Sequence, residues 1–185
     1  KVKKRKTDTT IIQHHKMPSK STKSKEKDSL KSYSKVIKKK LETNEYKSAL
    51  SKVQKALKLI TNDMDSSSKK YAYNIYILGG DAYIAIDNIE QATKSLEKAI
   101  ELDPTLPIAY KKLYDIIWSS CINQHIIQKE QAFILKTYFL KFKEFIPADK
   151  YHEYMLQYAY ILYYNEDYDA SYQQWLKVEH EDPII

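Results

Sequence analysis

The sequence predicts an all-α protein built from a series of amphipathic helices. Glycine occurs only twice in 185 residues, as Gly79-Gly80, and proline only five times. Because β-hairpins depend on Gly, Asn and Asp at positive φ, a chain so poor in glycine is not expected to be rich in strands. Apolar residues make up 43% of the chain. From Leu30 onward they recur every three or four residues, which is the spacing of a helix that buries one face.

The first 28 residues differ from the rest of the chain. They are rich in Lys, Ser and Thr and show no helical periodicity, so residues 1–28 are predicted to form an extended basic tail and residues 29–185 the folded part. This tail holds three acidic residues and ten basic ones, which are Lys1, Lys3, Lys4, Arg5, Lys6, Lys16, Lys20, Lys23, Lys25 and Lys27.

Capping and helix-breaking residues divide the folded part into helices. Asn44 separates the first two helices, and a polar linker is expected from Asn62 to Ser68. Further helices are expected at about 71–86, 89–102, 107–120, 129–145, 149–164 and 167–181. The breaks between them fall at Asp87-Asn88, Asp103-Pro104, Asn123, Pro147 and Asn165.

Small residues recur at fixed intervals within these helices. In a 34-residue unit counted from Tyr73, Gly80 is at position 8, Ala92 at 20, Ala99 at 27 and Pro104 at 32. This pattern resembles the tetratricopeptide repeat, in which small residues let paired helices cross closely. A second unit starts at His152 and looser ones at Leu30 and Pro107. The resemblance implies a right-handed α-α superhelix of about four helix hairpins.

Two short stretches faintly resemble one member of this repeat class. Residues Thr43–Leu50 and Ala109–Tyr114 are similar to the start of the tetratricopeptide scaffold of the superkiller complex, which acts in RNA decay. That resemblance implies a role inside a nucleic-acid-containing assembly. Association with chromatin through the tail is an equal alternative.

The resemblance also implies where a partner would bind, because the first helix of each unit lines the groove of the superhelix. The corresponding residues are Asn74, Ile77, Asp81, Ile84, Ala85, Ile108, Lys111, Asp115, Trp118, Glu153, Leu156, Tyr160, Tyr163 and Tyr164. The three tyrosines are the sharpest candidates, since tyrosine buries a large area and still forms hydrogen bonds. Packing against a neighbouring helix is the alternative for them.

The tail carries the whole formal net charge of +7, because the rest of the chain has 21 basic and 21 acidic residues. A basic tail is expected to dock on an acidic partner, which can be RNA, DNA or an acidic protein. Arg5 is the only arginine, and lysine does not read bases bidentately. Two other interpretations stay open: a solvated segment, or a nuclear import signal at Lys3-Lys4-Arg5-Lys6.

No pattern of residues predicts catalysis, a cofactor or a metal site. Cys121 is the only cysteine, which excludes an intramolecular disulfide and a cysteine-based zinc site. No two histidines have the spacing of a helical zinc site, and no apolar run reaches the ~18 residues of a membrane span. An enzyme on a helical scaffold would need catalytic residues that the sequence does not supply.

These observations favour a non-catalytic scaffold or adaptor in the nucleus or cytoplasm. It would bind protein or peptide partners in its groove within a larger, nucleic-acid-containing assembly, and its lysine-rich tail would dock on an acidic partner. The alternative is a chaperone-type or transport adaptor whose basic tail is only a nuclear localisation signal.

Overall fold

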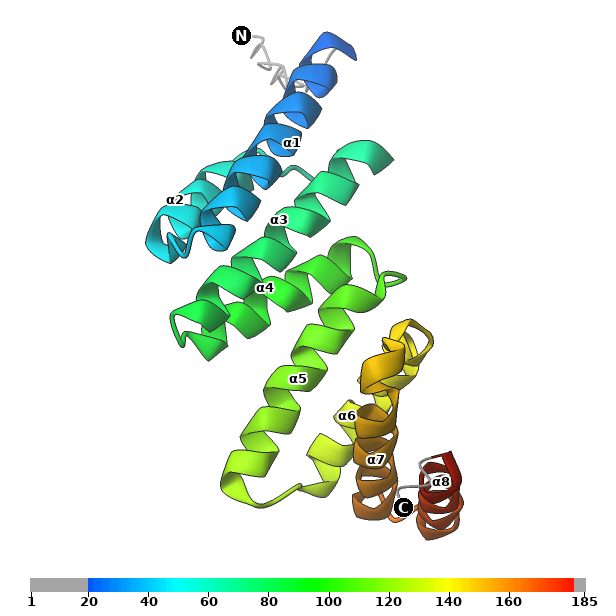
Figure 1. The fold of residues 1–185 in the computed structure, drawn as a ribbon. Helices are drawn as coiled ribbons and strands as arrows, with labels where there is room; N and C mark the ends of the chain where they lie inside the picture. Colours follow the sequence, from blue (N-terminus) through cyan, green and yellow to red (C-terminus); the bar gives the residue numbers. More distant parts are fainter. Residues whose placement is uncertain (1–19, 182–185) are drawn as a thin grey trace, which may run out of the picture.

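The computed structural model describes residues 20–181, and within that range it contains eight α-helices, one short 3-10 helix and no strand (Figure 1). The all-α class is therefore confirmed for this part of the chain. The helices are α1 (Lys20–Glu42), α2 (Tyr46–Leu57), α3 (Ser66–Ala85), α4 (Ile89–Leu102), α5 (Pro107–Gln124), α6 (Lys129–Phe142), α7 (Ala148–Tyr164) and α8 (Tyr168–Glu181), with the 3-10 helix η1 (Lys143–Phe145) after α6.

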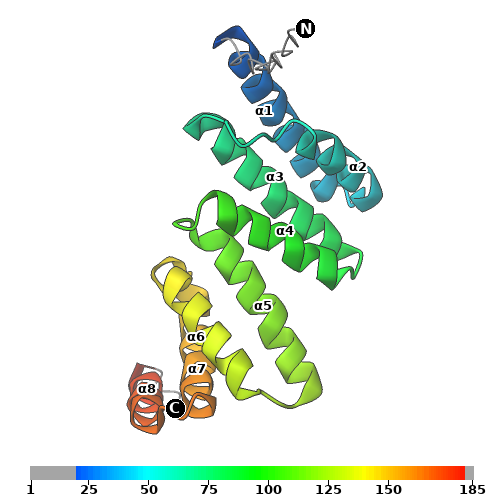
Figure 2. The ribbon, with the colours of Figure 1, turned by 180° about the vertical axis from the view of Figure 1, so that it is seen from behind.

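The helices pack in pairs that follow the order of the chain. Helix α1 packs on α2, α3 on α4, α5 on α6, and α7 on α8. Adjacent pairs are joined because α1 and α2 pack on α3, α4 packs on α5, and α6 packs on α7. The two views show an elongated row, with α1 and α2 at one end and α8 at the other (Figures 1 and 2).

The turn between the two helices of each pair is built in the same way four times. Its central residue, Asn44, Asp87, His125 or Glu166, has a left-handed φ of 58°, 58°, 54° or 64°. In each turn the following residue donates its backbone N–H to the carbonyl five residues before it, at 2.8–3.2 Å. The left-handed residue itself donates to the carbonyl three residues before it, at 2.9–3.1 Å. These two bonds define a Schellman motif, which satisfies the free carbonyls at a helix end.

The four turns also fall at related places in the sequence. Asn44, Asp87 and Glu166 are each the fifteenth residue of the units that begin at Leu30, Tyr73 and His152. In the unit from Pro107 the left-handed residue is His125, four residues later, because α5 continues to Gln124. The same turn therefore recurs in each of the four helix pairs, and in the third pair it comes four residues later because the first helix is longer.

Small residues sit where paired helices approach each other. A Cβ added at Gly80 would lie 2.9 Å from Cδ2 of Leu96 in α4, and one at Gly79 would lie 3.2 Å from Cγ1 of Val53 in α2. Ala92 and Ala99 of α4 are fully buried. The glycine pair therefore lets α3 pack closely against the helices on both of its sides. The pair lies inside a helix, as the sequence predicts.

Three helix boundaries differ from the sequence prediction. Helix α1 begins at Lys20, so residues 20–28, with Lys20, Lys23, Lys25 and Lys27, are helical and not part of an extended tail. This segment lacks Gly and Pro and leads directly into the apolar face that starts at Leu30, so a helix can form through it. The other basic residues of the predicted tail, Lys1, Lys3, Lys4, Arg5, Lys6 and Lys16, lie outside the described residues.

The remaining two differences concern α3 and α5. Helix α3 begins at Ser66, inside the predicted polar linker, because the Asp65 side chain accepts a hydrogen bond from the Ser68 N–H at 2.7 Å and caps the helix. Asn123 does not interrupt α5, which ends at the left-handed His125. Among residues 20–181, no helix is both long and apolar enough to cross a lipid bilayer.

The junction between the second and third helix pairs is more open than the one before it. Helix α5 packs closely on α4 but not on α3, and side chains bridge the remaining distance. The Tyr73 hydroxyl accepts from the Ala109 N–H at 3.2 Å, and Lys112 forms an ion pair with Asp81 at 2.5 Å. In the unit that begins at Pro107, position 8 is the bulky Tyr114, which is fully buried against Phe139 and Phe142 of α6.

Candidate partner-binding groove

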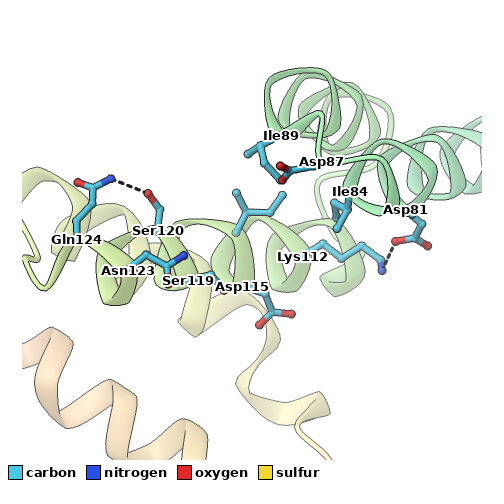
Figure 3. A pocket seen from close by; sticks show the side chains of 12 residues that line it. Asp81, Ile84, Asp87, Ile89, Lys112, Asp115, Ser119, Ser120, Asn123 and Gln124 are labelled. Atoms are coloured by element: carbon cyan, nitrogen blue, oxygen red, sulfur yellow. Dashed lines mark hydrogen bonds and ion pairs between the residues drawn. The ribbon is translucent and has the colours of Figure 1, made fainter.

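An open cavity of about 820 Å³ lies at this junction, between the C-terminal half of α3, the start of α4 and one side of α5 (Figure 3). Helix α3 contributes Asp81, Ile84 and Ala85, and the turn and first residue of α4 contribute Asp87 and Ile89. Helix α5 contributes the opposite wall, from Lys112 to Gln124. Helices α3 and α5 are not in close contact with each other, and the cavity lies between them, with the ion pair of Asp81 and Lys112 in its lining.

The cavity is acidic. Its lining contains three aspartates and one lysine. Asp81 is paired with Lys112 at 2.5 Å, and Asp115 is paired with Lys111 at 2.8 Å. Asp87 is exposed and forms no ion pair with any other residue in the range 20–181. A positively charged group on a partner is therefore favoured beside Asp87.

The walls of the cavity combine apolar and polar groups. Ile84 and Ile89 are partly exposed although both are large and apolar, and α5 contributes the half-buried Ile116 to the same lining. Ser120 accepts a hydrogen bond from Gln124 Nε2 at 3.0 Å, and Asn123 lies beside them. Exposed isoleucines next to amide and hydroxyl groups suit an extended peptide, which needs apolar contacts and backbone hydrogen bonds.

The structure brings together several residues that the sequence places in the groove. Asp81, Ile84 and Ala85 from α3 and Asp115 from α5 line this single cavity. Lys111 lies outside it, with its ammonium group 5.1 Å from the ring centroid of Tyr154 in α7. The Tyr154 hydroxyl donates to Asp115 at 2.8 Å. Partial burial acts to lower the pKa of Lys111, but the hydrogen bonds to Asp115 and Tyr154 raise it overall.

Other predicted groove residues lie elsewhere. Ile77 is only 7% exposed, because it packs in one apolar cluster with Leu96 of α4 and Leu113 of α5. Trp118 is half-buried and stacked on Tyr114, with ring centroids 6.3 Å apart. Leu156 packs against the same aromatic core. Asn74 is half-buried and does not line the cavity, and Ile108 and Glu153 are exposed outside it.

The three predicted tyrosines of α7 are exposed and form part of a larger aromatic surface. Tyr163 is 55% exposed, and Tyr160 and Tyr164 are exposed beside it. They contact aromatic residues of α8: Tyr160 lies edge-on to Trp175 at 5.1 Å, and Tyr163 to Tyr168 at 5.4 Å. The aromatic surface comprises Tyr160, Tyr163, Tyr164, Tyr168, Tyr172 and Trp175, all of them exposed.

Part of this surface was recoverable from the sequence. Tyr168, Tyr172 and Trp175 are spaced four and three residues apart, so they share one face of α8. The repeat pattern instead places Trp175 at an interior position, whereas it is 37% exposed. The cavity residues Asp87, Ile89 and Asn123 had no such signal, because they come together only through the placement of α3, α4 and α5 in the fold.

No group of three or more metal-binding side chains occurs among the residues described by the structure. Cys121 is buried, and burial raises the pKa of its thiol, which disfavours the reactive thiolate. Comparisons with family models and with curated proteins found no match to this chain.

Proposed function

We propose that this protein is a non-catalytic scaffold of the tetratricopeptide kind that holds a protein partner in the cavity between α3, α4 and α5. The repeat assignment is supported by the paired packing of the helices and by the four Schellman turns, three of which fall at the same position of their units. Helix pairs that expose one face need neighbours, so they stack into an open superhelix whose inner surface can bind partners.

One observation carries the binding proposal. The cavity of about 820 Å³ combines exposed isoleucines with an excess of carboxylates. A peptide segment with an apolar side chain flanked by Lys or Arg matches this surface, because the isoleucines bury the apolar group and Asp87 faces the cation. We infer that the partner presents such a segment in an extended or helical form.

We further propose that the scaffold works inside a nucleic-acid-containing assembly. Residues 1–19 carry six basic groups and one acidic group, and such a segment binds phosphate groups without reading sequence. The proposed compartment is the nucleus or the cytoplasm. Deleting residues 1–19 is expected to weaken retention in the assembly and to leave peptide binding at the cavity unchanged.

The binding proposal can be tested without knowing the partner. A library of random displayed peptides is selected on the full chain, and the affinity of the enriched peptides is measured by fluorescence polarisation. We expect the peptides to combine apolar and basic residues. The double variant Ile84→Arg with Asp87→Lys should lower the affinity of the selected peptides by about tenfold or more, because it removes an apolar contact and reverses a charge. A tenfold loss corresponds to about 1.4 kcal/mol of binding free energy.

The matched control changes an isoleucine and an acidic residue outside the cavity. Ile134→Arg with Glu130→Lys alters exposed residues of α6, and Ile134 is 39% exposed against 37% for Ile84. The control variant should bind the peptides as the unchanged protein does. Equal binding by both variants, or enrichment of acidic peptides, would show that the cavity is not the partner site.

A further inference from the structure

The described part of the chain is electrically polarised from one end to the other. Helices α1 and α2, with the turn between them, contain twelve lysines and four acidic residues, a net charge of +8. Residues 58–147 contain eleven of each sign, and residues 148–181 contain two lysines and seven acidic residues, a net charge of −5. The basic character of the protein therefore extends from the N-terminal segment into the folded helices.

Four of these lysines form a line along α1. Lys27, Lys31, Lys35 and Lys38 are spaced four, four and three residues apart, which places them on one face of the helix. The line is about 16 Å long at 1.5 Å per residue. Lys31, Lys35 and Lys38 are exposed, whereas Leu30 and Ile37 occupy the buried face. We call these four residues the lysine stripe.

Among the residues whose side chains the structure describes, none forms an ion pair with the lysine stripe. Within the described residues, Lys40, which pairs with Glu45, is the one lysine of α1 and α2 that forms an ion pair. Elsewhere eight lysines are paired, among them Lys94, Lys98, Lys129 and Lys150. Asp28 and Glu42 lie near the two ends of the stripe and form no ion pair with it. Its charges are thus available to an external anion.

The composition of this surface selects the type of anion. A protein interface is expected to have an apolar or aromatic centre, but Val36 is the single large hydrophobic residue exposed on α1 and α2. A membrane-binding helix would need an apolar face to insert. Single-stranded nucleic acid is usually held by stacking on exposed aromatic rings, and Tyr33 and Tyr46 are partly buried.

We propose that the lysine stripe of α1 binds the phosphodiester backbone of a nucleic acid duplex, without sequence preference. A duplex presents about one negative charge per 1.7 Å of its axis, which satisfies a line of point charges and requires no apolar contact. Lysine suits this role because it contacts phosphate as a point charge and does not read base edges bidentately. This site is separate from the cavity between α3 and α5.

The test measures binding of the full chain to a fluorescent duplex of about 20 base pairs by anisotropy, over a range of salt concentrations. The stripe variant is Lys27, Lys31, Lys35 and Lys38→Gln. Its affinity should fall by about tenfold or more, and the slope of log affinity against log salt should decrease by about 3–4 on DNA, at ~0.9 per contact. Duplex DNA and duplex RNA are compared as two sources of the same backbone.

The control removes the same number of charges from lysines that are already paired, through Lys94, Lys98, Lys129 and Lys150→Gln. This variant should keep most of the affinity and most of the slope. Deletion of residues 1–19 separates the contribution of that segment, and the stripe variant should still lose affinity in the deleted chain. Circular dichroism checks that both variants stay helical.

Three results would overturn the proposal. The first is an unchanged salt slope in the stripe variant, and the second is an equal loss in the control. The third is stronger binding of polyglutamate than of the duplex, which would identify an acidic protein as the partner. The stripe variant should retain peptide binding at the cavity, so failure of this proposal is distinct from failure of the scaffold proposal.

Discussion

At the residue scale, single side chains decide how closely the helices pack. Gly80 lies against the fully buried Leu96, whose Cγ and Cδ2 atoms would be 3.0 and 2.9 Å from an added Cβ. The sequence predicts this contact, because a small residue recurs where paired helices cross. It does not predict the burial of Ile77, since that depends on the tertiary packing that brings Leu96 and Leu113 against it.

Gly80→Ala should lower the free energy of unfolding by about 1 kcal/mol, because overpacking costs about 1–3 kcal/mol and higher helix propensity offsets about 1. In a Leu96→Ala background the same change should be neutral or stabilising, because the clash is gone. Chemical denaturation of the four proteins measures this cycle. A loss of the same size in both backgrounds would mean that Leu96 is not the obstacle.

Tyr114 links α5 to α7 by donating a hydrogen bond to Gln157 at 2.9 Å, and burial raises the pKa of its hydroxyl well above the ordinary value. In the unfolded chain the Tyr114 hydroxyl loses its proton near pH ~10, whereas in the folded protein it keeps its proton to a higher pH. Stability is therefore expected to be constant with respect to this group below about pH 10 and to fall above it.

Tyr114→Phe should reduce this alkaline loss, although it costs about 1 kcal/mol at neutral pH through the missing hydrogen bond. The measurement is the free energy of unfolding between neutral pH and pH ~11. Tyr151→Phe, at an exposed position of α7, serves as the control and should keep the original alkaline limb. An alkaline limb in Tyr114→Phe identical to that of the unchanged protein would contradict the assignment.

At the scale of elements, the helix ends are set by local chemistry. The Schellman turns at Asn44, Asp87, His125 and Glu166 close the first helix of every pair. Asn and Asp at two of them are readable signals, since these residues tolerate the left-handed region. His and Glu are not typical of this conformation, so the sequence carries no signal at His125 or Glu166. For this reason the sequence predicts the break after α5 at Asn123, two residues before the left-handed His125.

His125 is exposed and left-handed, so it tests the turn geometry. His125→Gly should raise the free energy of unfolding by up to about 1 kcal/mol, because glycine adopts positive φ without a steric cost. His125→Val should lower it by about 1–2 kcal/mol, since a β-branched residue is strongly disfavoured there. Thermal and denaturant unfolding report both. Stabilisation by Val would exclude a left-handed residue at this position.

At the scale of the whole molecule, the row of helix pairs places three different surfaces along one chain. The basic α1–α2 end, the acidic cavity and the aromatic surface of α7 and α8 follow one another in order. The helical class and most helices follow from apolar spacing alone. The cavity does not, because its walls come from α3, the start of α4 and α5, and the apolar spacing of single helices does not show how these segments are placed in space.

The most direct test of the scaffold proposal is photo-crosslinking from the two walls of the cavity. A benzophenone amino acid is placed at Ile84 in α3, at Asn123 in α5 or at the control position Ile134 in α6, and the full chain is exposed to extract. We expect one shared crosslinked partner at Ile84 and Asn123, which a selected peptide displaces, and none at Ile134. Crosslinking of the bound partner at Ile134 but at neither cavity position would contradict it.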